Sequence, residues 1–130
     1  MNGKWVFAAM LIMTGFSLTG LAMLSREAKP DLTVHVRPGG DDAGPGTAAQ
    51  PVGTLAKARD MVRETRKQRP LNAGAEIILH GGRYVLDGTL ELSAEDAGTS
   101  AAPIRYRAAR GEQPVLAGSA EIPAGAFTLL

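Results

Sequence analysis

Hydrophobic and polar residues alternate with a period of two in short segments of the chain, which glycine and proline turns separate. The alternation is clearest in residues 89–93, with the sequence TLELS, and in residues 104–108, with the sequence IRYRA. A period of two is typical of a half-buried β-strand, and no helical period fits either segment. Residues 96–100 and 110–114 follow these segments and consist largely of residues that favour turns. The pattern therefore predicts strand, turn, strand, turn.

Further strands are predicted on both sides of this region. Residues 32–37 alternate with apolar side chains on one face, and residues 75–80 form another apolar segment. A double glycine then turns the chain sharply into residues 83–86, and residues 115–117 begin one more strand after Pro114.

An amphipathic helix is predicted between the first two strands. Thr54 is a suitable N-cap residue, and Leu55, Ala58 and Val62 fall on one helical face. The last turn is rich in basic residues, which complement the negative end of the helix dipole, and Pro70 ends the helix. These basic residues are Arg63, Arg66, Lys67 and Arg69. A helix in this position is expected to cover the end of an apolar core formed by stacked strands.

The order of these motifs resembles a known family. Residues 81–118 contain GG-x-Y-x-L, TLEL, D-x-GT, P-I-x-Y-x-A and GE-x-PVL-x-G in succession, and residues 42–60 are similar to the pattern D-x-NPGT…P…TL-x-KAR. Together they resemble the N-terminal part of right-handed parallel β-helix proteins of the pectin-lyase-like superfamily, especially extracytoplasmic bacterial members that act on polysaccharides. The resemblance covers roughly residues 32–122. Gly44 and Ser119 depart from the family pattern, both at turns.

The resemblance implies a mostly β fold: a right-handed parallel β-helix, truncated after an N-terminal cap helix and the first two or three coils. Family members that are enzymes usually carry their catalytic residues on later, central coils. The chain is therefore expected to be the beginning of a longer polysaccharide-active protein, in the first place a glycoside hydrolase. The catalytic residues and polysaccharide contacts of that protein are expected to lie downstream of this chain. The alternatives are a polysaccharide lyase and a non-catalytic carbohydrate-binding or surface solenoid, because this fold serves many functions.

Residues 5–24 are uncharged and predominantly apolar, between Lys4 and Arg26, which predicts an export signal. Their length borders on that of a membrane span. The small residues Gly20 and Ala22 favour cleavage with a mature start near Met23. The expected division is a signal peptide or anchor over residues 1–24, a linker over 25–31, and the cap and first coils over 32–130. The expected location is periplasmic or extracellular, with membrane attachment through residues 5–24 if the leader is retained.

The composition limits the partners and the kinds of site that can be expected. The sequence has 14 basic and 13 acidic residues, and removal of the leader with Lys4 leaves 13 of each. A neutral mature chain gives no general reason to expect nucleic acid or an anionic membrane as a partner. The absence of cysteine from the sequence excludes disulfides, thiolate metal sites, a cysteine nucleophile and a lipoprotein anchor.

Two pairs of residues are candidate ligands or bases. Asp41 and Asp42 lie in a glycine-rich loop and could bind calcium, but paired aspartates beside glycine and proline are ordinary turn residues. His35 and His80 lie far apart in the sequence, without the spacing of a Ser-His-Asp site. Each is expected to be a residue of a coil surface or corner rather than a ligand or base.

Glu91, Glu95 and Asp96 are the nearest approach to a pair of catalytic carboxylates, yet Asp96 belongs to a turn and Glu91 to a solvent face. Arg105 and Arg107 could line a groove for an acidic sugar, although solvated arginines on a strand are more common. No phosphate-binding glycine loop is recognised. The sequence therefore assigns no catalytic residue, metal ligand or cofactor within the chain.

Overall fold

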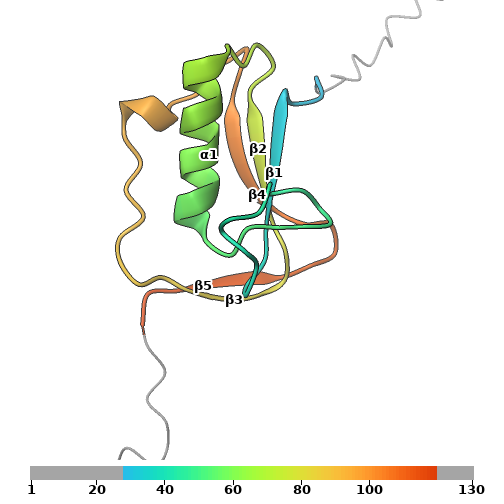
Figure 1. The fold of residues 1–130 in the computed structure, drawn as a ribbon, viewed down its shortest axis with the longest axis vertical. Coiled ribbons are helices and arrows are strands. Elements are labelled where there is room, and N and C mark those ends of the chain that lie inside the picture. The colour runs from blue at the N-terminus through green and yellow to red at the C-terminus, as the bar shows by residue number, and fades with distance from the viewer. Residues whose placement is uncertain (1–27, 120–130) are drawn as a thin grey trace, which may run out of the picture.

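The computed structural model describes residues 28–119 (Figure 1). The predicted leader, residues 1–24, and the apolar residues 126–130 at the other end lie outside the described residues. The elements, in chain order, are β1 (Leu32–Val36), α1 (Leu55–Gln68), β2 (Ala75–Leu79), β3 (Gly82–Val85), the short 3₁₀-helix η1 (Ala94–Asp96), β4 (Ile104–Ala108) and β5 (Pro114–Ala117). The fold is thus made of small parallel sheets with one α-helix.

The five strands of the described residues form two parallel sheets. The first has the order β1-β2-β4, and its register aligns Val34 with Ile77 and Ile77 with Tyr106. The second pairs β3 with β5 and aligns Tyr84 with Leu116. Each strand pair therefore repeats the path of the preceding one, with β2 leading into β3 and β4 leading into β5. Figure 1 shows β3 and β5 crossing one end of the first sheet.

Helix α1 connects β1 to the parallel strand β2 and packs against the first sheet (Figure 1). Its N-cap is Thr54, whose hydroxyl accepts a hydrogen bond from the backbone N–H of Lys57, as the sequence predicted. Leu55, Ala58 and Val62 are its buried residues. They form one core with the buried side chains of β1, β2 and β3, which are Val34, Val36, Ala75, Ile77, Leu79 and Tyr84.

The outer edge of β1 is covered by the loop that precedes α1. Val52 forms a parallel bridge with Val36, and its N–H donates to the carbonyl of His35 at 3.0 Å. The N–H of His35 in turn donates to the carbonyl of Gly46 at 2.7 Å. Among the described residues, no strand pairs with the other side of the first sheet, beyond β4. The sheet is therefore closed at its first strand and open at its last.

One predicted strand is wrong. Residues 89–93 form no strand, and Leu92, which lies on the apolar face of that alternation, is 55% exposed. This segment runs beside α1, where the guanidinium of Arg59 donates to the carbonyl of Glu91 at 2.9 Å. Ser93 then caps η1. Helix contacts and capping use the backbone groups that a strand would offer to a neighbouring strand.

Candidate functional site

The ends of consecutive strands bring together three residues, His35, His80 and Glu112, here called the histidine cluster. His35 belongs to β1, His80 follows β2, and Glu112 lies in the turn between β4 and β5. The Nδ1 of His35 is 3.0 Å from the Nε2 of His80, and the rings stack with centroids 5.3 Å apart. The Nδ1 of His80 is 3.1 Å from the Oε1 of Glu112. A continuous chain of polar contacts thus joins the ends of β1 and β2 to the turn before β5.

Charged residues on two neighbouring strands surround His35. Glu76 on β2 and Arg107 on β4 form an ion pair, with Nη2 of the arginine 3.1 Å from Oε2 of the glutamate. The pKa of His35 is lowered, because burial disfavours its charged form and because His80 and Arg107 repel a positive charge there; Glu76 acts in the opposite direction. The hydrogen bond from Arg107 lowers the pKa of Glu76.

Glu112 also binds the backbone of the neighbouring turn. Its Oε2 accepts a hydrogen bond from the N–H of Gly81 at 2.7 Å. This bond and the contact with His80 lower the pKa of Glu112. On the inner side of the same corner, the buried hydroxyl of Tyr84 lies 2.7 Å from the carbonyl of His80 and 2.9 Å from that of Val36. The histidine cluster therefore lies over a corner that main-chain contacts already organise.

The structure corrects the expectation that the two histidines are unrelated. Both are partly exposed residues at the surface of the turns, as predicted, but they contact each other and share a carboxylate. Sequence reasoning missed this arrangement because the register that aligns His35 with Ile78, two residues before His80, is not readable from strand alternation. The arrangement joins two imidazole rings and a carboxylate in one hydrogen-bonded chain.

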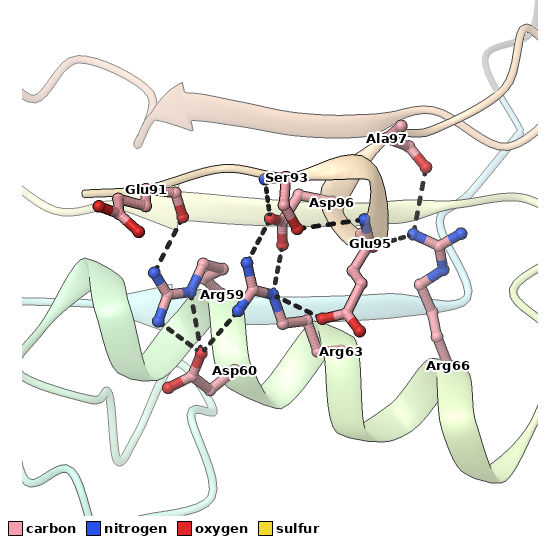
Figure 2. A network of polar contacts seen from close by, with 9 residues as sticks. All are labelled: Arg59, Asp60, Arg63, Arg66, Glu91, Ser93, Glu95, Asp96 and Ala97. Carbon is pink, nitrogen blue, oxygen red and sulfur yellow. Dashed lines mark hydrogen bonds and ion pairs between the residues drawn. The ribbon is translucent and has the colours of Figure 1, made fainter.

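The carboxylates Glu95 and Asp96 are part of a network with the arginines of α1 rather than an acid and base pair (Figure 2). Asp96 receives two hydrogen bonds from the Arg63 guanidinium, at 2.8 Å from Nε and 2.5 Å from Nη2. Hydrogen bonds from Arg63 lower the pKa of Asp96 to about 2. Such a carboxyl is ionised at every pH at which a general acid would have to be protonated.

The rest of this network fastens the loop before β4 to the helix. Arg59 donates to the carbonyl of Glu91 and Arg66 to the carbonyls of Glu95 and Ala97 (Figure 2). Of the basic residues that the sequence attributed to the helix dipole, Arg66 thus binds backbone carbonyls of this loop and Arg63 binds a carboxylate. The contacts of Glu91, Glu95 and Asp96 are therefore those of residues that hold a loop to a helix, not those of a catalytic pair.

Asp41 and Asp42 lie in the loop before α1 and bind backbone groups. The Oδ1 of Asp42 accepts from the N–H groups of Gly53 and Thr54, at 2.8 and 3.0 Å, and its Oδ2 accepts from the Thr54 hydroxyl at 2.7 Å. Asp41 accepts from the N–H of Ala43. Within residues 28–119, no group of three or more histidine, aspartate or glutamate side chains is arranged to hold a metal ion. These contacts match the turn interpretation of the loop.

A cavity of about 290 Å³ opens between the end of α1 and the loop before β4. Its lining residues include no carboxylate and no histidine; they are Arg66, Pro70, Leu71, Gly74, Ala97, Gly98, Thr99, Ala102 and Ile104. Arg105 and Arg107 are exposed on β4, and Arg107 is bound to Glu76. The cavity therefore lacks the two carboxyl groups that glycoside hydrolysis usually needs.

Comparison with known proteins gives one match in structure. A solved structure described as "Glycoside hydrolase" superposes with a TM-score of 0.63 and 32% sequence identity, over 66% of this chain and 15% of that chain. The chain thus spans about 15% of the length of that protein. No family model and no curated protein matches the sequence. The matched part has a glycoside-hydrolase-like fold. Of the described residues, none belongs to a helix with the length and hydrophobicity needed to cross a membrane.

Proposed function

We propose that this chain is the N-terminal part of an exported, polysaccharide-active protein with a right-handed parallel β-helix, and that this protein is a glycoside hydrolase. The observation that supports this most directly is the match to a glycoside hydrolase at 32% identity, of which the chain spans 15%. On this proposal the described residues start the scaffold. Catalysis and polysaccharide binding belong to the remainder of the protein.

The strand pairing supports the β-helix. The sheets β1-β2-β4 and β3-β5 are parallel, and the order of strands and turns repeats from β2–β3 to β4–β5. Parallel strands that stack in this way, with connections of the usual right-handed sense, generate a solenoid of coils. Helix α1 then covers the core next to the first strand, which is the position of a terminal cap.

Exposed apolar residues mark where a further coil would stack. Tyr106 on β4 occupies the same register position as the buried Ile77, yet it is 36% exposed. Leu116 on β5, the register partner of the buried Tyr84, is also more than half exposed. In a solenoid each coil buries the apolar face of the preceding one, so these residues match an unfinished stack.

The described carboxylates support placing catalysis elsewhere. Asp96 is held ionised by Arg63, and Asp42 is occupied by three donors from Gly53 and Thr54. Glu76 is bound to Arg107. A glycosidase needs one carboxyl group that can donate a proton and a second one across the bond. None of these three residues is placed for that task.

The activity test uses the complete protein and the 130-residue chain side by side, on a panel of neutral and acidic polysaccharides. The complete protein is expected to release new reducing ends without forming unsaturated sugars, because hydrolysis adds water whereas a lyase leaves a double bond. The chain alone is expected to release nothing. Unsaturated products would identify a lyase, and binding without turnover would identify a surface or carbohydrate-binding solenoid. Turnover by the chain alone would contradict the proposal and return attention to Glu91, Glu95 and Asp96.

Export is tested separately. A fusion of residues 1–30 to a reporter that is active only outside the cytoplasm is expected to show activity, and the matched fusion that lacks residues 5–24 is expected to show none. N-terminal sequencing of the exported product should find a start near Met23. An intact Met1 on an exported product would instead indicate a membrane anchor, and equal reporter activity in both fusions would contradict export by this segment.

A further inference from the structure

We propose that the histidine cluster is a pH-dependent connection between the ends of β1 and β2 and the turn before β5: its contacts persist with no added proton or with one, and they open when the cluster takes up a second. The proposal rests on the contacts of His35, His80 and Glu112 and is independent of the enzymatic function proposed above. It makes the stacking of the first turns sensitive to acid in the range where histidine titrates.

The directions of the hydrogen bonds follow from the chemistry of the three groups. An ionised carboxylate only accepts, so the Nδ1 of His80 carries a proton and donates to Glu112. The contact between Nε2 of His80 and Nδ1 of His35 then needs one N–H and one lone pair. Two neutral rings satisfy it, with His35 donating. One cationic ring and one neutral ring satisfy it as well.

A second proton removes the only acceptor in this contact. With both rings cationic, an N–H of His35 faces an N–H of His80 across 3.0 Å, and two positive charges repel each other there. The pair therefore has to separate before both rings are protonated. Two sites coupled in this way titrate as a pair rather than as independent groups.

The charges on neighbouring elements favour one added proton over two. Glu112, from the turn before β5, offers its carboxylate to His80 and so compensates the first charge. At His35, Arg107 on β4 opposes a second charge, and Glu76 on β2, which would favour it, is bound to that same arginine. Arg37, which follows β1, also helps to lower the pKa of Glu112. The lowered pKa of His35 is consistent with this arrangement.

Opening the pair would loosen specific main-chain contacts. The N–H of His80 donates to the carbonyl of Val36 at 2.8 Å, and the N–H of Gly81 donates to Glu112 at 2.7 Å. Both bonds join the turns that carry the cluster. When the rings separate, the side chains that hold His80 and Glu112 in place lose a partner, so both amides are expected to exchange with solvent faster.

The sequence contains two histidines, which makes a direct measurement practical. The full chain, labelled with ¹⁵N-histidine, gives signals from these two rings alone, and their nitrogen shifts report which atoms carry protons. At high pH both rings are expected to carry the proton on Nδ1. During acidification, His35 is expected to become cationic below the ordinary histidine value of about 6.5. Amide exchange at His80 and Gly81 should accelerate in the same pH range.

Two variants separate the proposal from a purely structural contact. His80→Gln removes the second positive charge, so the protonation of His35 is expected to move up toward the ordinary value. Glu112→Gln removes the charge that compensates the first proton, so the pair should open at higher pH. Glu95→Gln, a carboxylate of the α1 network, is the matched control and should leave both rings unchanged. Unfolding of either variant would leave the wild-type titration as the deciding measurement.

The proposal is overturned if His35 becomes cationic at the same pH in the wild-type chain and in His80→Gln. It is also overturned if both rings become cationic in the wild-type chain while the amides of His80 and Gly81 stay protected. A wild-type chain in which Nδ1 of His80 carries no proton at high pH would contradict the hydrogen-bond directions on which the proposal depends.

Discussion

Strands at the beginning and at the end of the described chain align in register but have very different surroundings. Ile77 on β2 is completely buried, whereas Tyr106, its partner in register on β4, is 36% exposed. In the second sheet, Tyr84 on β3 is buried and its partner Leu116 on β5 is 53% exposed. Alternation thus specifies which face of a strand is apolar, and the neighbouring layers determine how deeply that face is buried.

Two features at the first strand account for this difference in burial. At the first strand, α1 packs on the sheet and Val52 pairs with the outer edge of β1. Within residues 28–119, neither a helix nor a strand serves the outer side of β4 in this way. Within the described residues, the beginning of the fold is therefore closed and its end is open.

The largest expected effect separates two leucines. Leu79→Ala, at a position that is 6% exposed in the core, should lower the free energy of unfolding by about 2 to 5 kcal/mol because it removes buried methyl groups and leaves a cavity. Leu92→Ala, at a position that is 55% exposed, should change it by less than about 0.5 kcal/mol. Urea unfolding of the two variants at one pH provides the comparison. Equal losses would mean that Leu92 is buried, as its alternation predicted.

The sequence predicted most of the elements because their signals are local. Thr54 and Pro70 bound a helix whose apolar residues repeat with helical spacing, and the structure has α1 at Leu55–Gln68. The strands β1, β2, β4 and β5 likewise lie where alternation and turns predicted them. The segment 89–93 has equally good alternation and forms no strand, since Arg59 and the cap of η1 engage its backbone. A local signal was present: Ser93 and Asp96 have the spacing of a capping box.

The histidine cluster could not be predicted because it depends on register. His35 lies on β1, His80 follows β2 and Glu112 lies in the turn before β5. Only the alignment of β1 with β2 and of β2 with β4 brings these positions together. A shift of one residue would place the histidines on opposite faces. The structural role of the carboxylates in the α1 network was easier to predict, because the side chains of turn residues such as Asp96 ordinarily bind backbone groups and nearby side chains.

A second prediction compares two glycines with nearly the same backbone angle. Gly74 has φ of +79° and precedes β2, where an added Cβ would lie 2.1 Å from the carbonyl oxygen of Pro103. Gly111 has φ of +78° in the turn before β5, with nothing within 4 Å. Gly111→Ala should cost about 1 kcal/mol for the left-handed conformation. Gly74→Ala should cost a further 1 to 3 kcal/mol or so for overpacking.

The measurement is again urea unfolding, with the two alanine variants compared at the same pH. The difference between them isolates close packing, because the conformational cost is common to both. If Gly111→Ala is the more damaging change, the turn before β5 is more tightly packed than the start of β2, and the contrast between the closed and open regions fails.

The third prediction weakens the helix that closes the first region. Thr54→Ala removes the hydroxyl that accepts from the N–H of Lys57 and donates to Asp42, so it should cost about 1 kcal/mol. Thr54→Ser keeps a hydroxyl in the same place and should retain most of the stability. Thermal unfolding of the two variants tests this. A Thr54→Ser variant as unstable as Thr54→Ala would show that the methyl group, rather than the cap, stabilises this position.

The last comparison concerns the link between α1 and the loop that leads to β4, where the expected effect depends on pH. Asp96 is ionised in the fold down to a pKa of about 2, against an ordinary value of 3.8, because Arg63 donates hydrogen bonds to it. Since the folded chain has the lower pKa, the unfolded chain binds more protons between these values. The stability that this carboxylate contributes is therefore complete above pH 3.8 and is lost as the pH falls toward 2.

Asp96→Asn should flatten this acid-induced loss. The measurement is the urea midpoint of the wild-type chain and the variant between pH 5 and pH 2, where the two curves should converge as the wild-type carboxyl is protonated. Glu95→Gln is the control, because its side chain is exposed and lies 3.7 Å from Arg63. Asp42, Glu76 and Glu112 also have lowered pKa values, so both chains will lose stability in acid. Only a difference confined to the range of Asp96 assigns the effect to this link, and parallel curves would show that the loop is held to the helix by its carbonyl contacts alone.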